Sequence, residues 1–111
     1  MSKVSICGIP HTVEVTEDKF DSNTQGIILF NNAKIRINAE LTPELKQRIL
    51  IHETVHGILT YLGYTDLAAD EVFVSSLAGA IDESFSIKEV QEWESIEEKT
   101  LRERLNQPLK G

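Results

Sequence analysis

The feature that most constrains this chain is the run His-Glu-Thr-Val-His at residues 52–56, which lies inside an apolar stretch from Ile49 to Leu62. Residues four apart on an α-helix lie one above the other, so His52 and His56 can present two imidazole nitrogens to one metal ion. Glu53 is about 100° further round such a helix. We therefore expect Glu53 beside the metal and not on it, where a carboxylate can take a proton from a metal-bound water.

A pattern with three fixed positions also occurs by chance, on an ordinary helix with two partly buried histidines and a surface glutamate. The neighbouring residues favour the metal interpretation. The 4, 3, 4, 3 spacing of a core-facing stripe is followed by Leu45, Ile49, His52, His56 and Leu59. Buried imidazoles need partners, because an unpaired buried polar group costs a few kcal/mol, and a divalent cation would provide them.

Length and composition predict one small domain spanning residues 1–111. The 111 residues can build a single core, and 41% hydrophobic with 26% charged residues is typical of a soluble globular protein. The net charge of -7, without a Lys/Arg cluster, argues against nucleic-acid binding and disfavours acidic substrates.

Several absences in the sequence predict a cytoplasmic protein. No apolar run approaches the roughly 18 residues of a membrane span. The first residues contain no sustained apolar segment of a secretion signal. Cys7 is the single cysteine and forms no internal disulfide, so we expect it to be a buried or half-buried structural thiol.

The segments before the histidine helix predict a small antiparallel sheet of two to three strands. Two β-prone runs, Gly26 to Phe30 and Lys34 to Asn38, flank an Asn pair that suits a hairpin turn because Asn tolerates positive φ. Residues 12–17 alternate apolar and polar side chains like a half-buried strand. One apolar face of this sheet can pack on the histidine helix, which makes the fold class α+β.

Three helices are expected. Thr42 as N-cap, Pro43 at the first position and Gly63 after the end bound the histidine helix at 43–62. A second helix should follow the connection at 64–66 and run to about Ile81. A third begins at the capping-box spacing Ser86-x-x-Glu89 and covers residues 86–105. The core of the domain is then residues 26–81.

Gly57 lies inside the histidine helix, where glycine costs about 1 kcal/mol relative to alanine. It follows Glu53 by four residues and so shares its face of the helix. Two explanations remain open. Either a strand or helix packs closely there, or the site needs clearance for a substrate or metal beside the carboxylate.

Catalytic zinc usually keeps three protein ligands and one open position, so the histidine pair needs a third ligand. On the second helix, four apolar residues share one face with Glu71: Leu67, Val74, Ala78 and Ile81. A carboxylate on a core-facing stripe is unfavourable unless it is paired or bound to a cation, so Glu71 is the predicted ligand. The alternative for Glu71 is a salt bridge, for example to Arg48, or a hydrogen bond to a metal-free histidine. Asp66 and His11 are the rival ligands.

The combination of His52, Glu53 and His56 with a downstream helical Glu71 resembles the zincin metallopeptidases. Within them it is similar to the gluzincin type, including small phage and bacterial peptidase-like domains. The resemblance covers residues 26–81 and implies a minimal zincin-like fold, a Zn²⁺ cofactor and a peptide or protein substrate held by strand addition. For the residue that stabilises the transition state in this family, the candidates in this chain are Tyr61 and Tyr64.

The predicted function is therefore zinc-dependent hydrolysis of a peptide bond, with Glu53 as general base and zinc bound by His52, His56 and Glu71. The alternative function is a catalytically silent module with a zincin-like fold that binds zinc or a partner protein. A third possibility is that no metal binds and the polar residues pair with one another.

Overall fold

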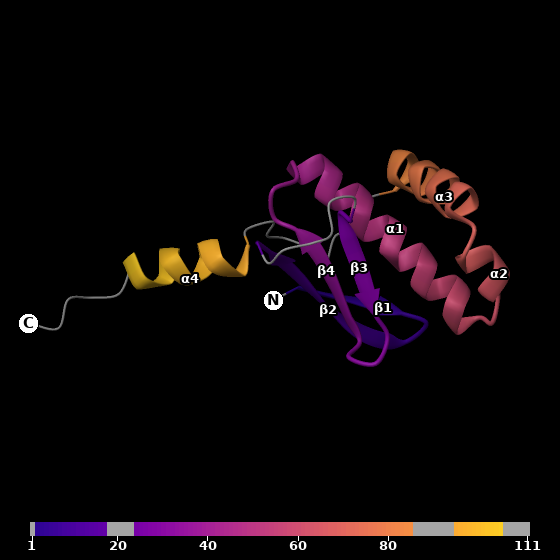
Figure 1. The fold of residues 1–111 in the computed structure, drawn as a ribbon, viewed down its shortest axis with the longest axis horizontal. Helices are drawn as coiled ribbons and strands as arrows, with labels where there is room; N and C mark the ends of the chain where they lie inside the picture. The colour runs from indigo at the N-terminus through magenta and orange to yellow at the C-terminus, as the bar shows by residue number, and fades with distance from the viewer. Residues whose placement is uncertain (1, 18–23, 86–94, 106–111) are drawn as a thin grey trace, which may run out of the picture.

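The computed structural model describes residues 2–17, 24–85 and 95–105. Within these ranges the chain forms a four-stranded sheet and four helices, so the α+β class is confirmed. The long helix α1 (Pro43–Tyr61) lies between the sheet and the shorter helices α2 (Thr65–Ala68) and α3 (Glu71–Ser84), while α4 (Ile96–Leu105) extends away from the rest (Figure 1). None of the described helices is both long and apolar enough to cross a membrane.

The sheet is larger than predicted and is mixed. Its strands are β1 (Ser2–Ile6), β2 (Ile9–Thr16), β3 (Gly26–Leu29) and β4 (Lys34–Asn38), in the spatial order β1-β2-β4-β3. The two hairpins are antiparallel, whereas β2 and β4 run parallel. This parallel pairing aligns Val13 with Ile35 and Val15 with Ile37, so the two hairpins together form one continuous apolar face.

The two hairpin turns differ from the sequence predictions. Cys7 and Gly8 connect β1 to β2 with φ of 50° and 82°, the left-handed pair that a two-residue hairpin requires. Cys7 is therefore exposed, and its prediction as a buried thiol was wrong. In the β3–β4 turn the positive φ falls on Ala33, at 47°, and not on the Asn pair.

Helix α1 begins and ends close to the predicted residues. The Thr42 hydroxyl accepts a hydrogen bond from the Leu45 backbone N–H at 3.3 Å, and Pro43 occupies the first helical position. Leu62 is the C-cap, and Gly63 follows with φ of +87°, a conformation that favours glycine.

Helix α1 buries two separate faces. Leu50 packs on the sheet with the apolar side chains of β1, β2 and β4. Ile51, Val55 and Leu59 pack instead against α2 and α3. Because successive residues are about 100° apart around a helix, His52 and His56 lie between these two faces. The strip of α1 that carries them stays uncovered between β3 and α3.

The second predicted helix is in fact two. Helix α2 ends at Ala68, and α3 begins at Glu71 after the N-cap Asp70, whose carboxylate accepts a hydrogen bond from the Phe73 N–H at 3.1 Å. The sequence analysis did not identify Asp70 as a cap, although Asp is a favoured N-cap residue and here determines where α3 begins. Val74 and Ala78 are buried as expected, whereas Leu67 is 38% exposed.

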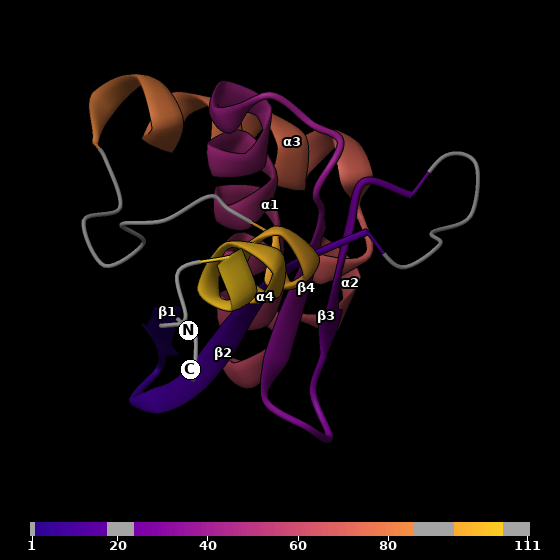
Figure 2. The same cartoon turned by 90° about the vertical axis from the view of Figure 1, so that its left-hand side faces the viewer.

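The described part of the third predicted helix is α4. The predicted start at Ser86 and Glu89 lies outside the described residues. Helix α4 is instead capped by buried Ser95, whose hydroxyl accepts a hydrogen bond from the Glu98 N–H at 2.9 Å. Glu97 accepts a hydrogen bond from the Thr16 hydroxyl at 2.9 Å, which attaches this end of α4 to β2. Figure 2 views α4 nearly end-on, in front of the sheet. Helix α4 itself buries no side chain.

Candidate metal centre

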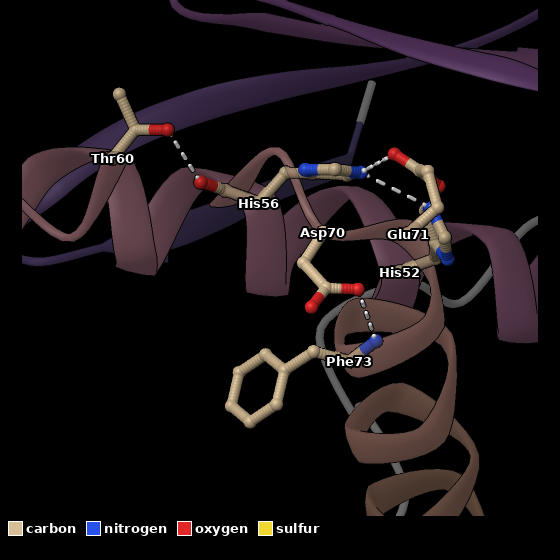
Figure 3. A network of polar contacts seen from close by, with 6 residues as sticks. All are labelled: His52, His56, Thr60, Asp70, Glu71 and Phe73. Atoms are coloured by element: carbon tan, nitrogen blue, oxygen red, sulfur yellow. Dashed lines mark hydrogen bonds and ion pairs between the residues drawn. The ribbon is translucent and has the colours of Figure 1, made fainter. Parts of the chain in front are cut away.

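Three predicted site residues meet at one point on the uncovered strip of α1. Nε2 of His52 lies 3.2 Å from Nε2 of His56. The Glu71 carboxylate reaches both rings, with Oε2 at 3.1 Å from His52 Nε2 and Oε1 at 2.9 Å from His56 Nε2 (Figure 3). In the described part of the chain, these are the only three His, Cys, Asp or Glu residues grouped closely enough to hold a metal ion.

Two helix features bring the three side chains together. The histidines are one turn apart on α1, so their rings lie one above the other with centroids 4.8 Å apart. Glu71 is the first residue of α3, directly after the Asp70 cap. Glu71 shares the face of α3 that buries Val74 and Ala78 against α1, as the apolar stripe predicted. Because it is the first residue of the helix, its side chain is 66% exposed.

The spacing of the ligand atoms suits a tetrahedral metal. Zinc–nitrogen and zinc–oxygen bonds of about 2.0–2.2 Å in tetrahedral geometry place neighbouring ligand atoms roughly 3.3–3.5 Å apart. The two imidazole nitrogens are 3.2 Å apart, and each faces a different Glu71 oxygen, at 3.1 Å for His52 and 2.9 Å for His56. With one ligand atom from each residue, the three atoms lie within 4.8 Å of one another. A small contraction is expected where the side chains hydrogen-bond directly. The donor set of two imidazoles and one carboxylate is also one that zinc accepts.

The histidines are half-buried and do not belong to the core stripe predicted for them. Their side chains are 18% and 17% exposed, and Leu45 of the same stripe is 42% exposed. The prediction assumed one buried face, whereas α1 has two with the histidines between them. The result is a site that is shielded on both flanks but reachable from solvent.

Glu53 lies on the sheet side of the histidine pair and is only 8% exposed. Its side chain packs beside Gly26 of β3, and the Ile28 backbone hydrogen-bonds to it. Burial raises the pKa of the Glu53 carboxyl to about 7; His56 opposes this shift, Glu71 adds to it, and the Ile28 hydrogen bond opposes it. A carboxyl of this kind can both accept and release a proton near neutral pH.

The electrostatics at His52 favour the form that binds metals. Burial lowers the pKa of His52, and the neighbouring His56 lowers it further, while the charge and hydrogen bond of Glu71 act in the opposite direction. A lowered pKa keeps the ring neutral at pH 7, and only a neutral imidazole has a lone pair available for a cation.

The cluster lies in a pocket of about 840 Å³ between β3 and helices α1, α2 and α3. One wall is the edge strand β3, with Gly26, Ile27 and Ile28, and the opposite wall includes Ala68, Ser75 and Ala78. At Gly26 an added Cβ would collide with the Ile49 side chain, so glycine is what lets β3 approach α1 here. The sequence contained no signal that Gly26 lines a site.

The other residues considered from the sequence lie apart from this cluster. Asp66 is exposed in α2 and is not part of the group of ligands. His11 is fully buried in β2, with Nδ1 2.8 Å from the Ile9 carbonyl and Nε2 2.8 Å from the Tyr61 hydroxyl. Neither Tyr61 nor Tyr64 lines the pocket. Arg48 pairs with Asp82 and not with Glu71.

The structure also decides between the two explanations for Gly57. A Cβ there would lie 3.0 Å from Ile28 Cδ1 and 3.1 Å from Ile6 Cδ1, tighter than ordinary van der Waals contact. Gly57 therefore lets the sheet pack closely on α1. It is not needed as clearance for a ligand.

No family model, curated protein or solved structure matches this chain.

Proposed function

We propose that this chain is a zinc-dependent peptidase in which His52, His56 and Glu71 hold the metal and Glu53 is the general base. The observation that carries the proposal is the convergence of the three ligand atoms in an open pocket with a buried carboxyl beside them. The resemblance to gluzincins rests on the same residues and supports the same activity.

When bound, zinc would supply Lewis-acid chemistry, polarising a water and a substrate carbonyl. Glu53 takes the proton from the attacking water and delivers it to the leaving amine. In the metal-free protein the pKa of Glu53 is about 7, and a cation bound nearby would lower it and favour the carboxylate form that accepts the proton. The Ile28 backbone and the packing of Gly26 hold this carboxyl in place on the sheet side of the pocket.

The edge strand β3 offers a way to hold an extended substrate. It is the last strand of the sheet and borders the pocket along residues 26–28. A peptide backbone laid along this edge could add a strand to the sheet beside the metal centre. Such pairing places a peptide bond, and not a side chain, next to Glu53.

Replacing Glu53 with Gln tests the proposal, because the amide keeps the shape of the carboxyl and cannot accept the proton. Zinc-loaded wild-type and Glu53→Gln protein are incubated with a mixture of unstructured peptides, and cleavage is followed by mass spectrometry. We expect about one zinc per chain in both proteins and a loss of cleavage of at least about 100-fold in the variant. Equal cleavage by both proteins would refute the role of Glu53.

One observation favours a second candidate function, a zinc-binding interaction module without catalysis. Neither tyrosine considered for stabilising the transition state lines the pocket, and Tyr61 is bonded to His11. In that case the wild-type protein binds zinc and peptides but cleaves none. The same incubation separates the two functions, because it measures metal content and cleavage independently.

A further inference from the structure

Arg48 places a positive charge in the pocket one helical turn before His52 on α1. It is the only Lys or Arg among the pocket-lining residues in the described ranges. Its side chain is 53% exposed, so it can be reached from the pocket. This local charge contrasts with the net charge of -7 over the whole chain.

The guanidinium group of Arg48 is only weakly engaged within the described residues. Its Nε lies 3.4 Å from Asp82 Oδ2, at the long end of hydrogen-bond distances. Asp82 is on α3 and contacts the Nε side of the guanidinium group. The terminal amino groups can still form the paired hydrogen bonds with which arginine recognises a carboxylate.

The packing of β3 on α1 gives the direction of the strand, and with it the side of the scissile bond on which Arg48 lies when a peptide pairs antiparallel with β3. Gly26 packs against Ile49 and Glu53, and the next contact along the strand, Ile28, packs against Gly57. Strand β3 therefore runs in the same direction as α1. A peptide antiparallel to β3 would pass Thr60 first, then the metal cluster, and reach Arg48 last.

We propose that Arg48 selects substrates with a carboxylate on the C-terminal side of the scissile bond. This inference rests on the proposed peptidase function and names the substrate class of that site. The carboxylate can belong to an Asp or Glu side chain or to the C-terminus of the substrate. Both present the same planar acceptor to the guanidinium fork.

Peptide binding to zinc-loaded Glu53→Gln protein tests this inference without requiring cleavage. The probes are the amidated peptides N-acetyl-Ala-Ala-Ala-Glu-amide and its Gln counterpart, together with N-acetyl-Ala-Ala-Ala-Gln bearing a free C-terminus. Isothermal titration calorimetry gives each Kd. We expect one or both carboxylate peptides to bind about tenfold more tightly than the neutral peptide. Comparing the peptide with the Glu side chain and the peptide with the free C-terminus shows which of the two carboxylates Arg48 recognises.

Zinc can attract a carboxylate by itself, so the decisive comparison adds Arg48→Gln to the same protein. We expect the preference for carboxylate peptides to fall to about twofold or less, with zinc content unchanged. Arg104→Gln, on exposed α4, is the matched control for the loss of one positive charge and should keep the full preference.

The inference would be overturned by a preference that survives Arg48→Gln or by an equal loss of preference in Arg104→Gln. It would also be overturned if the parent protein bound no peptide or showed no preference. Failure of the peptidase proposal looks different. In that case wild-type protein cleaves no peptide, while the Arg48-dependent preference in binding is still measured.

Discussion

Nε2 of His52 lies 3.2 Å from Nε2 of His56, and a Glu71 oxygen lies within hydrogen-bonding distance of each ring. Two neutral imidazoles cannot direct lone pairs at each other at this distance without repulsion. In the metal-free protein each Nε2 can instead carry a proton that it donates to the Glu71 carboxylate, whereas a bound cation needs both lone pairs free. Proton and metal therefore compete for one site, and we expect zinc affinity to fall as pH drops and the histidines become protonated.

The raised pKa of Glu53 predicts a pH-dependent stability of the metal-free protein. The unfolded chain loses the Glu53 proton near pH 4.5, whereas the folded chain keeps it until about pH 7. Between these values the folded state binds more protons, so this contribution to the free energy of unfolding decreases as pH rises. Below pH 4.5 Glu53 makes its full contribution to the free energy of unfolding. Above pH 7 this contribution has been lost, and the decrease levels off at about 3 kcal/mol.

Urea unfolding of wild-type and Glu53→Gln protein across this range measures the effect, because contributions from other groups largely cancel in the difference. We expect the free energy of unfolding of the variant, relative to that of the wild type, to rise steadily from pH 4.5 to 7. A constant difference would show that the Glu53 carboxyl titrates normally in the folded protein.

Tyr61→Phe tests whether Tyr61 has a structural role. The Nδ1–H of His11 donates to the Ile9 carbonyl, so in the neutral ring Nε2 accepts from the Tyr61 hydroxyl. Removing the hydroxyl leaves a buried acceptor unpaired and should lower the free energy of unfolding by about 1–3 kcal/mol. Zinc content should not change. A large fall in the rate of cleavage at unchanged stability would instead assign Tyr61 to the reaction.

Gly57→Ala and Gly79→Ala form a matched pair of helix substitutions. Alanine gains up to about 1 kcal/mol over glycine inside a helix. At Gly79 in α3 no atom lies within 4 Å of an added Cβ, so we expect stabilisation of about 0.5–1 kcal/mol. At Gly57 the methyl group meets three isoleucine methyl groups at 3.0–3.3 Å, and we expect net destabilisation of about 1 kcal/mol. Thermal unfolding measures both, and equal shifts in Tm would contradict the close packing at Gly57.

Local signals in the sequence were sufficient for α1 and for the relation between its polar residues. Thr42, Pro43 and Gly63 mark the ends of this helix through capping and backbone preferences that act over a few residues. The spacing of His52 and His56 follows from helix geometry alone, so their proximity could be predicted before any tertiary contact was known.

Features that depend on long-range packing could not be predicted in the same way. The parallel pairing of β2 with β4 joins strands distant in sequence, and no short pattern specifies it. The Cys7–Gly8 turn was missed because cysteine rarely takes positive φ. Glu71 was predicted from a stripe on one continuous helix. Val74 and Ala78 of that stripe do share a face of α3 with Glu71, whereas Leu67 lies on the separate helix α2.

The most direct test of the metal centre is the zinc content of protein purified without an affinity tag and equilibrated with buffered zinc. We predict about one zinc per chain for the wild type and for Asp66→Ala, since Asp66 lies outside the cluster. Glu71→Ala should retain far less, because only two ligands remain. Zinc-free wild-type protein, or full zinc occupancy in Glu71→Ala, would contradict the account.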